Sequence, residues 1–413
     1  MSEWKKVKLG DYIDVLSGFA FKSKDFSDSG IPVIKIKNVC PPYISLEDLS
    51  YVPNSIAFQN PRYILRKGDV LIAMTGSHIN QIASVVGRVG RVRYDAITVL
   101  NQRVGKIVNK NEAKSSLDYI YYYLSQYEVK VELAQKAGGA ANQANISPSD
   151  IKNLLFPCPP LETQHRIATI LSRYDSLIEN YQKQIKLLEE AAQRLYKEWF
   201  IDLHFPGHEN TNIVDGVPVG WEKKKISDIC QTVGGGTPST KVAEYYDDGN
   251  IKWVTPTDIT RSNCLCLFDT DKKITEDGLA HSSAKILPPE TILMTSRASV
   301  GYFGIYDCEV CTNQGFISCI PNERSYQMYM LYNLINRVEE IRQKAGGSTY
   351  LEISKSVFRD FDIVLPSCMV LETFQEQSHK MLDCMRQIAK QLRLLTEARD
   401  RLLPKLMSGA IEV

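Results

Sequence analysis

Two pairs of closely spaced cysteines are the side chains best suited to bind a metal ion. Cys264 is followed by Cys266, and Cys308 by Cys311. Four thiolates from two such pairs can hold a zinc ion in a tetrahedral structural site. The alternative is that all four are strand residues with small buried side chains, as is usual for cysteines in a reducing compartment. We predict this second arrangement, with no metal bound by the chain.

The stretch Val39-Cys40-Pro41-Pro42-Tyr43 would, if it were active, point to methyl transfer. It is similar to the (Asn/Asp/Ser)-Pro-Pro-(Tyr/Phe) motif of amino-methyltransferases, in which the first side chain accepts a hydrogen bond from the target amino group. A thiol is a poor acceptor, and no glycine-rich motif for S-adenosylmethionine accompanies the stretch. We predict a diproline turn after a strand. A DNA methyltransferase-like enzyme that uses this stretch is the alternative function.

Other catalytic patterns do not occur in the sequence. There is no Walker A pattern, Rossmann glycine fingerprint, His-Glu-x-x-His zinc motif or Gly-x-Ser-x-Gly elbow. Glu222-Lys223-Lys224 imitates part of a nuclease Glu-x-Lys but lacks an upstream Pro-Asp partner, so we interpret it as a solvated charge run. We therefore predict no catalytic residue in this chain.

Length and composition indicate a globular protein of several domains. The chain has 413 residues, of which 44% are hydrophobic and 23% charged, and domains usually hold ~100–200 residues. It contains no run of about 18 apolar residues that could cross a membrane. The N-terminal segment is charged and lacks the apolar core of a signal peptide. We expect a cytoplasmic protein with no membrane association.

The two halves of the sequence repeat each other. The matching segments are Trp4-Lys5-Lys6 with Trp221-Glu222-Lys223, LIAMTGS (71–77) with ILMTSRAS (292–299) around Met-Thr, Asn101-Gln102 with Asn313-Gln314, and QKAGG (135–139) with QKAGG (343–347). The offset falls from 217 at the first of these pairs to 208 at the last, as insertions and deletions in the loops of a shared fold would produce. The sequence therefore predicts two copies of one unit.

Each copy begins with a mixed lobe of strands and helices. In the first lobe, residues 31–39, 69–76 and 97–108 are predicted to be strands, and residues 117–137 a helix. Gly138-Gly139, and Gly346-Gly347 in the second lobe, are predicted to end such helices in the left-handed conformation. The QKAGG repeat would then be a helix cap and turn, at which each lobe leaves its last helix for a long helix.

The second part of each copy has the heptad spacing of a long helix. Apolar residues alternate at intervals of four and three in both copies, and only Arg399 interrupts the second series. The predicted coiled-coil residues are Ile167, Leu171, Tyr174, Ile178, Tyr181, Ile185, Leu188 and Leu195 in the first helix, and Met381, Met385, Ile388, Leu392, Leu395 and Leu402 in the second. Two separate amphipathic helices packed on globular cores are the alternative.

These elements predict an α+β protein of four parts. They are lobe 1 (1–155), a central helix (156–211), lobe 2 (212–365) and a C-terminal helix (366–413). Two like units tend to pack with pseudo-two-fold symmetry, so we expect the helices to form an intramolecular antiparallel coiled coil with a lobe at each end. A helix from 163 to 199 would be about 55 Å long and would act as a spacer.

Charge is distributed unevenly over the two lobes. Residues 1–155 hold 20 basic and 14 acidic residues, a net charge of +6, whereas residues 212–365 hold 16 and 20, a net charge of −4. A basic first lobe fits a polyanionic partner such as nucleic acid. The acidic second lobe does not favour uniform electrostatic attraction.

Three stretches, together with the doubled layout, resemble the specificity subunit of type I restriction–modification systems. They are Pro157-Cys158-Pro159-Pro160-Leu161-Glu162-Thr163-Gln164 followed by Ile167, Gly236-Thr237-Pro238-Ser239 with Trp253-Val254-Thr255-Pro256, and Lys405-Leu406-Met407-Ser408-Gly409. The first looks like the entry to the family's central helix, the second like the start of a target recognition domain, and the third like the terminal conserved region. The resemblance covers nearly the whole chain.

The resemblance implies a division of labour among subunits. Each lobe would be a target recognition domain that reads one half of a bipartite site in double-stranded DNA. The two long helices would set the half-site spacing and dock two methyltransferase subunits, which bring S-adenosylmethionine and usually methylate adenine. Motor–nuclease restriction subunits would use ATP and magnesium to cleave DNA. This chain would catalyse nothing and bind no cofactor.

Basic residues of both lobes are candidates for phosphate or guanine contacts. They are Lys22, Lys24, Lys35, Lys37, Arg88, Arg91 and Arg93 in lobe 1, and Lys241, Lys252, Arg261 and Arg297 in lobe 2. For each of them a solvated surface charge is the alternative. The repeated Asn-Gln pairs could read adenine, but their recurrence in lobes that should read different bases favours a structural hydrogen-bond role. A coiled-coil scaffold with no nucleic-acid role also stays open.

Overall fold

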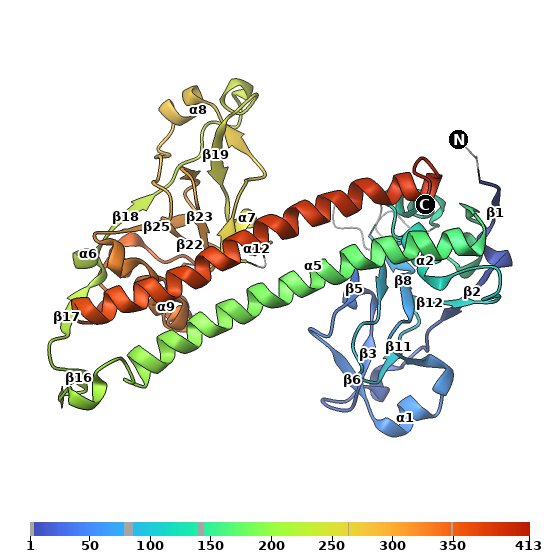
Figure 1. Cartoon of the computed structure of the whole chain (residues 1–413), viewed down its shortest axis with the longest axis horizontal. Coiled ribbons are helices and arrows are strands. Elements are labelled where there is room, and N and C mark those ends of the chain that lie inside the picture. The colour runs from blue at the N-terminus through green and yellow to red at the C-terminus, as the bar shows by residue number, and fades with distance from the viewer. Residues whose placement is uncertain (1–3, 78–85, 139–143, 263, 348–349) are drawn as a thin grey trace. The chain divides into compact units, whose positions relative to one another are not determined.

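The computed structural model describes residues 4–77, 86–138, 144–262, 264–347 and 350–413. They divide into two compact units: unit 1 is Met1–Leu177 with Leu395–Val413, and unit 2 is Ile178–Leu394. Each unit holds one lobe and a part of both long helices, which Figure 1 shows in green and red. The fold is α+β, as predicted. The predicted boundaries at 155, 211 and 365 separate lobes from helices, and the two compact units are divided within the helices.

Lobe 1 is built on two sheets. The larger sheet has six strands in the order β2 (Ile13–Ser17), β12 (Val104–Asn109), β8 (Val70–Ala73), β10 (Val89–Arg91), β5 (Tyr43–Ile44) and β4 (Val39–Cys40). The smaller sheet has the order β6 (Ser50–Val52), β3 (Ile31–Ile34), β11 (Thr98–Leu100) and β7 (Ile64–Leu65). The runs predicted as strands do form strands, because their β-branched side chains pack on both sides of these sheets.

Lobe 2 repeats this topology. Its larger sheet has the order β18 (Cys230–Gly234), β25 (Phe316–Pro321), β22 (Ile292–Thr295), β23 (Phe303–Tyr306) and β20 (Cys266–Leu267), and its smaller sheet the order β21 (Lys273–Ile274), β19 (Ile251–Val254) and β24 (Cys311–Thr312). The parallel pairs β10–β5 and β3–β11 of lobe 1 recur as β23–β20 and β19–β24. The doubling predicted from the sequence is confirmed by this shared strand order.

Strand pairing corrects one detail of the internal alignment. Ala73 lies opposite Val104, and Thr295 lies opposite Phe316, at the start of equivalent strands. Ala73 therefore corresponds to Thr295, so the match around Met-Thr is displaced by two residues. The error arises because a shift of two residues keeps every side chain of a strand on the same face, so the apolar pattern still matches.

The helix predicted over residues 117–137 is two helices. They are α2 (Leu117–Leu124) and α3 (Tyr127–Lys136), and lobe 2 has α9 (Gln327–Asn336) and α10 (Val338–Lys344). The Ser125 hydroxyl donates to the Tyr121 carbonyl at the end of α2 (2.7 Å), and Gln126 has the extended backbone of a new N-cap. Lobe 2 breaks between Asn336 and Val338 without a serine, so the division into two helices is common to both lobes.

Short elements complete both lobes. The helices are α1 (Asn54–Phe58), α4 (Pro148–Lys152), α6 (Ile226–Ile229), α7 (Pro256–Thr260), α8 (Glu276–Ala280) and α11 (Lys355–Arg359). The strands are β1 (Lys6–Lys8), β9 (Thr75–Gly76), β13 (Ala144–Asn145), β14 (Leu155–Pro157), β15 (Ile213–Val214), β16 (Val217–Pro218), β17 (Glu222–Lys225) and β26 (Asp362–Leu365). The pairs β1–β14 and β17–β26 join the first and last strands of each lobe, just before the long helices begin.

The long helices α5 (Leu161–Tyr196) and α12 (Cys368–Ser408) run antiparallel within each unit. In unit 1 the first turns of α5 share a core with the last turns of α12, where Ile167 and Leu171 pack with Leu406 and Met407. In unit 2 the later part of α5 shares a core with the first part of α12. None of the described helices is both long and apolar enough to span a bilayer.

The heptad residues of both helices are buried or half-buried. On α5 this holds for all eight predicted residues, from Ile167 to Leu195. On α12 the structure also buries Leu382 and Ala389, next to the half-buried Met381 and Ile388. The buried face of α12 is wider than a two-position seam because α12 packs on lobe 2 as well as on α5.

Candidate nucleic-acid interface

Four loops come together in each lobe, and three of them carry the repeated motifs. We call residues 18–24, 74–77, 101–103, 137–138 and 144–146 the loop cluster of lobe 1, and residues 235–241, 296–300, 313–315, 345–347 and 350–353 the loop cluster of lobe 2. They contain the loop after β2 or β18, the turn after β8 or β22 (the turn after the Met-Thr strand), the Asn-Gln turn and the QKAGG loop. The sequence did not show that these motifs would meet.

Backbone hydrogen bonds hold the loop cluster of lobe 1 together. The Phe19 N–H donates to the Leu100 carbonyl (2.9 Å), the Met74 N–H to the Arg103 carbonyl (3.0 Å) and the Ile146 N–H to the Met74 carbonyl (2.9 Å). Lobe 2 has the same frame. The equivalent bonds join Gly236 N–H to Thr312 O (2.9 Å), Ser296 N–H to Gly315 O (2.8 Å) and Ile353 N–H to Ser296 O (3.0 Å). The frame depends on main-chain atoms, so the side chains on it are free to differ between the lobes.

A glycine directly after β2 or β18 allows two of these loops to approach each other. A Cβ atom on Gly18 would lie 2.3 Å from the Asn101 carbonyl oxygen, and one on Gly235 would lie 2.1 Å from the Thr312 carbonyl oxygen. Both separations are far below a van der Waals contact, and backbone atoms cannot swing away as a flexible side chain does. Only glycine fits at these two equivalent positions.

The repeated asparagines have the structural role that their recurrence favoured. Asn101 Oδ1 accepts from the Arg103 N–H (3.5 Å), and Asn313 Oδ1 accepts from the Gly315 N–H (2.8 Å). Each asparagine thus closes its own turn by bonding two residues ahead. The neighbouring glutamine Gln102 is exposed.

The QKAGG segments are not left-handed helix caps. Ala137 and Ala345, which follow α3 and α10, are extended, and neither Gly138 nor Gly346 lies in the left-handed region. Gly347 alone among the described glycines of the two segments has a positive φ, of 132°. Gly139 lies outside the described residues, so the prediction for it is not tested.

Each QKAGG segment instead begins a loop that returns to the lobe. Gly138 pairs with Asn145, and Gly346 pairs with Glu352. The returning strand reaches the turn after the Met-Thr strand, where Asn145 pairs with Thr75. A short helix and a strand, α4 with β14 and α11 with β26, then follow before α5 and α12. The predicted direct passage to the long helices was therefore wrong.

The side chains on the common frame differ between lobes. In lobe 1, Asn145 Oδ1 accepts from the Thr75 hydroxyl (2.8 Å) and from Arg103 Nη1 (3.3 Å). In lobe 2, Glu352 takes the place of Asn145 and pairs with Arg297 (Oε2–Nε, 3.6 Å), whose guanidinium lies 5.5 Å from the Tyr350 ring centroid. The sequence analysis missed Thr75, Asn145 and Arg103. The Ile-Ser pair that follows each QKAGG could have pointed to Asn145, because it aligns Asn145 with Glu352.

Three of the predicted DNA-contacting lysines are exposed within the loop clusters. Lys22 and Lys24 follow Gly18 in lobe 1, and Lys241 follows Gly235 in lobe 2. These side chains can swing freely toward a polyanion, because four-carbon ammonium side chains need no fixed geometry to neutralise a phosphate.

Other predicted residues are engaged within the lobes. Lys35 Nζ donates to Ser50 Oγ (2.8 Å), and burial lowers the pKa of its ammonium group, as does the neighbouring Lys37. Lys252 Nζ donates to the Phe268 carbonyl (2.7 Å). Further pairs join Lys37 to Asp48 and Arg261 to Asp271, the second at 3.2 Å. A DNA contact by Lys35 or Lys252 would first have to break these bonds.

Three predicted arginines of lobe 1 lie toward the helical part of unit 1. Arg91 Nη1 pairs with Asp118 Oδ1 (2.7 Å), and its guanidinium lies over the Tyr121 ring at 4.4 Å. Arg93 Nη2 lies 3.7 Å from the buried Asp175 carboxylate of α5. Arg88 lines a pocket of about 300 Å³ bordered by β10, α2, α5 and α12. These positions favour a role in attaching the lobe to its helices.

Asp175 is the main polar attachment of unit 1. Its side chain is 1% exposed. Its Oδ2 accepts from the Tyr122 hydroxyl (2.7 Å), and its Oδ1 accepts from Arg399 Nη1 (3.1 Å). Arg399 therefore interrupts the apolar series of α12 because it neutralises a buried carboxylate on α5, and buried charges need such a partner.

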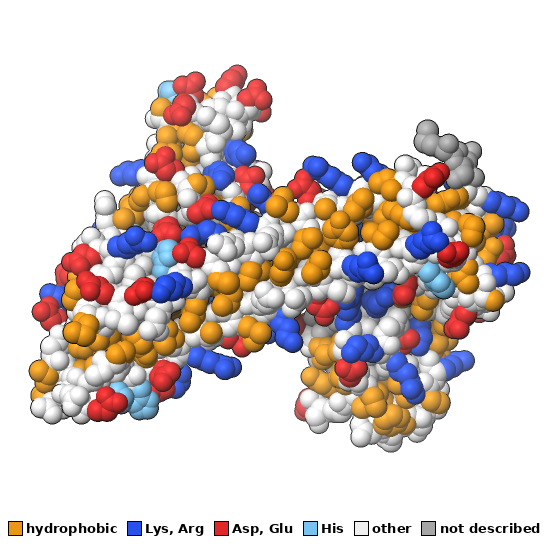
Figure 2. Space-filling view, viewed as in Figure 1, with side chains coloured by type: hydrophobic (Ala, Val, Ile, Leu, Met, Phe, Trp, Pro, Cys, Tyr) orange, Lys and Arg blue, Asp and Glu red, His pale blue; other side chains and the backbone are white. Residues whose placement is uncertain are grey.

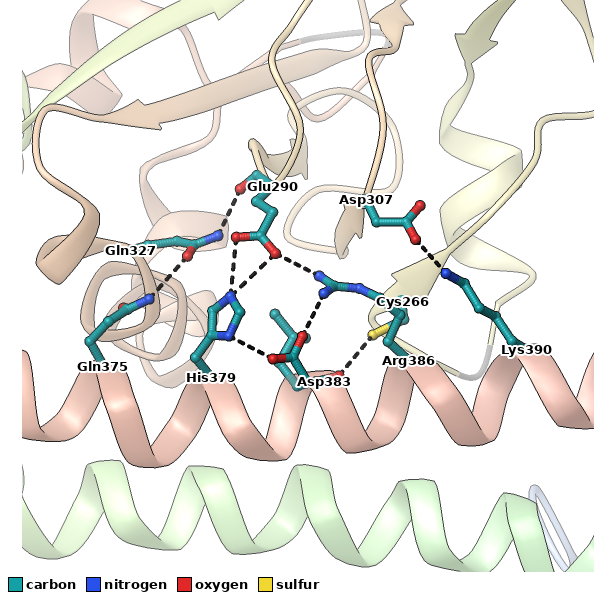
Figure 3. A network of polar contacts seen from close by, with 10 residues as sticks. Cys266, Glu290, Asp307, Gln327, Gln375, His379, Asp383, Arg386 and Lys390 are labelled. Atoms are coloured by element: carbon teal, nitrogen blue, oxygen red, sulfur yellow. Dashed lines mark hydrogen bonds and ion pairs between the residues drawn. The ribbon is translucent and has the colours of Figure 1, made fainter.

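Unit 2 has a different attachment, which Figure 3 shows. Glu290 follows β21 and α8 in lobe 2, and its carboxylate accepts from His379 Nε2 (3.1 Å) and Arg386 Nη2 (2.9 Å) of α12. Asp383 lies on the other side and contacts His379 Nδ1 (3.1 Å) and Arg386 Nη1 (2.6 Å). The hydrogen bond to Glu290 raises the pKa of His379, and the same bond lowers the pKa of Glu290 to about 2.

The paired cysteines and the diproline stretch lie in or beside the sheets of the lobes. Cys266 lies buried in β20 and donates to the Leu382 carbonyl (3.7 Å), and Cys311 lies buried in β24. Cys264 and Cys308 lie in bends beside these sheets and are half-buried, so the prediction of four buried strand residues holds for only two of them. Among the residues that the structure describes, Glu290, His379 and Asp383 form the one group with metal-ligand spacing. The Arg386 guanidinium pairs with both carboxylates of this group. The four paired cysteines are not part of such a group. Pro41-Pro42, with a cis peptide bond, forms the turn of the β4–β5 hairpin.

A protein-family model matches both halves of the chain. The model for the type I restriction modification DNA specificity domain matches residues 1–190 and 218–401. The chain belongs to this family. The two matches of the specificity domain begin in the two lobes and extend over both long helices, so the internal repeat is a repeat of this domain.

Relatives of this specificity-domain chain carry consistent names. The HindI specificity subunit of Haemophilus influenzae is 23% identical over 480 residues, and the alignment covers 100% of both chains. The MjaIX specificity subunit of Methanocaldococcus jannaschii is 38% identical over 153 residues, which are 37% of this chain and 35% of that protein. The crystal structure of the type I S subunit from M. genitalium shares the fold, with a TM-score of 0.61, 17% identity and coverage of 98% and 96%.

Proposed function

We propose that this chain is the DNA-recognition subunit of a type I restriction–modification complex, in which each lobe reads one half of a bipartite site in double-stranded DNA. The observation that carries the proposal is the pair of loop clusters, which have one backbone frame and different side chains. An asymmetric bipartite site requires two readers of this kind. Membership of the specificity-domain family supports the same function.

The proposal assigns each loop cluster as the DNA-facing surface of its lobe. Lys22, Lys24 and Lys241 contact phosphates there, because they are exposed, basic and adjacent to the loops. Of the remaining predicted residues, Arg297 belongs to the loop cluster of lobe 2. Arg91 and Arg93 act within unit 1, since their side chains are only 15% and 23% exposed and are held against Asp118 and Asp175.

The long helices are proposed to set the spacing of the half-sites and to dock two methyltransferase subunits. On the face in view, Figure 2 shows hydrophobic side chains along both helices. Leu177 and Leu187 of α5 and Leu394 of α12 are about half exposed, in addition to the buried heptad series. Apolar side chains that gather into a patch on a helix surface would suit a contact with another protein.

Catalysis and cofactors then belong to partner subunits. The methyltransferase subunits would bind S-adenosylmethionine, and the motor–nuclease subunits would use ATP and magnesium. The complex would act in the cytoplasm, where the host DNA lies.

Methylation mapping tests the proposal. The chain is co-expressed with the methyltransferase subunits encoded beside it, and the host DNA is read by single-molecule sequencing. We expect methylated adenines in one bipartite sequence, which disappear when the gene for this chain is deleted. Methylation that persists after the deletion would contradict the proposal. Binding of S-adenosylmethionine by the purified chain alone would favour the methyltransferase alternative.

A further inference from the structure

We infer that Arg103 in lobe 1 and Arg297 in lobe 2 are the base-reading residues of the two half-sites, and that each contacts the guanine of a G·C pair. The inference rests on the proposed function and names the groups that would read the DNA. Its starting point is that each loop cluster presents one exposed arginine whose guanidinium is held by a neighbouring side chain.

The two arginines are held from one equivalent position. Asn145 and Glu352 lie at equivalent positions in the segment that returns after QKAGG. Asn145 pairs with Thr75, and Glu352 pairs with Arg297. Asn145 Oδ1 holds Arg103 Nη1 at 3.3 Å, and Glu352 Oε2 lies 3.6 Å from Arg297 Nε. The position of the supporting residue is therefore the same in both lobes, whereas the two arginines come from different loops.

The contacts that hold each guanidinium leave some of its N–H groups available to DNA. Arg103 Nη1 also donates to the Thr75 hydroxyl (3.4 Å), so both supporting bonds of Arg103 use one nitrogen. The Arg297 side chain is 43% exposed, and the Tyr350 ring lies 5.5 Å from its guanidinium carbon. An arginine fork donates two parallel hydrogen bonds to guanine O6 and N7, and the geometry must be fixed for both to form.

Holding the side chain in advance reduces the entropy that binding would cost. The unsupported Lys22, Lys24 and Lys241 have no such constraint, and an ammonium group cannot make the paired bonds of a fork. The arrangement therefore separates two roles within one loop cluster: lysines that neutralise phosphates, and one supported arginine that distinguishes bases.

Because the arginines come from different loops, the two half-sites need not place their guanine at the same distance from the methylated adenine. Arg103 follows the Asn-Gln turn, and Arg297 follows β22. The half-sites would thus differ in sequence although the two lobes share their backbone frame. This is the asymmetry that a bipartite site of two unlike halves requires.

Methylome sequencing of variants tests the inference in the intact methyltransferase complex. Arg103→Ala and Arg103→Lys are expected to lower the preference for one guanine by about 10- to 100-fold in one half-site only. Arg297→Ala and Arg297→Lys should do the same in the other half-site. Asn145→Ala and Glu352→Ala should relax the same positions as their arginines, since they act by positioning them.

Lys22→Ala and Lys241→Ala are the matched controls. They remove a positive charge from the same loop clusters and should lower methylation evenly, with the base preferences unchanged. Unchanged base preferences in the arginine variants would overturn the inference, as would relaxation of both half-sites by a single variant. Equal loss of methylation at every site in the alanine and lysine variants, with thermal melting unaltered, would also overturn it. A wild-type complex that methylates no bipartite sequence would instead reject the proposed function.

Discussion

Asp175 is the residue at which several side chains of unit 1 converge. We expect Asp175→Ala to lower the free energy of unfolding by about 3–5 kcal/mol, because the buried Tyr122 hydroxyl loses its partner and the largely buried Arg399 keeps only an exposed one. Denaturant unfolding measures the change. Asp400 also pairs with Arg399 but is 59% exposed, so Asp400→Ala should cost less than about 1 kcal/mol. Equal effects of the two substitutions would refute this assignment.

The glycines of the loop clusters should respond unequally to alanine. Gly138→Ala and Gly346→Ala should change the free energy of unfolding by less than about 0.5 kcal/mol, since a Cβ atom meets nothing within 4 Å at either position. Gly18→Ala and Gly235→Ala should destabilise by about 1–3 kcal/mol, because the Cβ atom would overlap a carbonyl oxygen. Urea unfolding of the four variants distinguishes this picture from a left-handed cap, in which Gly138→Ala would also be costly.

Sequence alone could select basic residues as candidates for DNA contact but could not separate them by role. Lys22 and Arg93 look equally suitable in the sequence. They differ because Asp175, far along the chain, comes to lie beside Arg93, and no local pattern announces a partner from another element. Asn145 was missed for the related reason that its importance comes from Thr75 and Arg103, which are distant in sequence.

At the scale of elements, the attachment of lobe 2 to α12 should depend on pH. The raised pKa of His379 means that its ion pairs stabilise the fold fully below pH ~6.5, its usual value when unfolded, and that this contribution is lost as the pH rises through the folded-state pKa. Glu290, with its pKa lowered to about 2, contributes fully above pH ~4.5 and loses its contribution only toward pH 2. The attachment should be strongest between these limits, near pH 5–6.

Thermal melting at pH 5.5 and pH 8.5 checks this dependence. Wild type should exceed His379→Gln in melting temperature at pH 5.5, and the difference should shrink at pH 8.5. His165→Gln, at an exposed position on α5, is the control and should show little difference at either pH. A His379→Gln difference that stays constant or grows with pH would contradict the prediction.

The elements themselves were largely predictable. The strand runs and the heptad series give strong periodic signals, so β3, β8, β12 and both long helices follow from the sequence. The break between α2 and α3 does not, because the helical pattern of residues 117–137 gives no sign that Gln126 takes an extended backbone and begins a second helix. The wide buried face of α12 was likewise unforeseen, since it depends on how lobe 2 packs against that helix.

At the scale of the whole molecule, the helices should determine which DNA sites are recognised. Insertion of one heptad in register into each of α5 and α12 lengthens each helix by about 10.5 Å, or about three base pairs. We expect the methylated bipartite site to keep both half-site sequences and to gain about three base pairs between them. Methylome sequencing gives the answer directly.

A control insertion separates helix length from chain length. Seven residues inserted after Asn210, in the exposed segment between α5 and β15, should leave the half-site spacing unchanged. An unchanged spacing with the longer helices would show that the helices do not set it.

The main-chain frame of the loop clusters also bears on how such proteins change over evolutionary time. The bonds from Ile146 to Met74 and from Ile353 to Ser296 persist whatever side chains the neighbouring positions carry. Under the proposed function, mutations at those positions would alter what is recognised with little penalty to folding. A lineage would then acquire a new recognition sequence by a few substitutions, or by exchange of a whole lobe, without any change to its long helices.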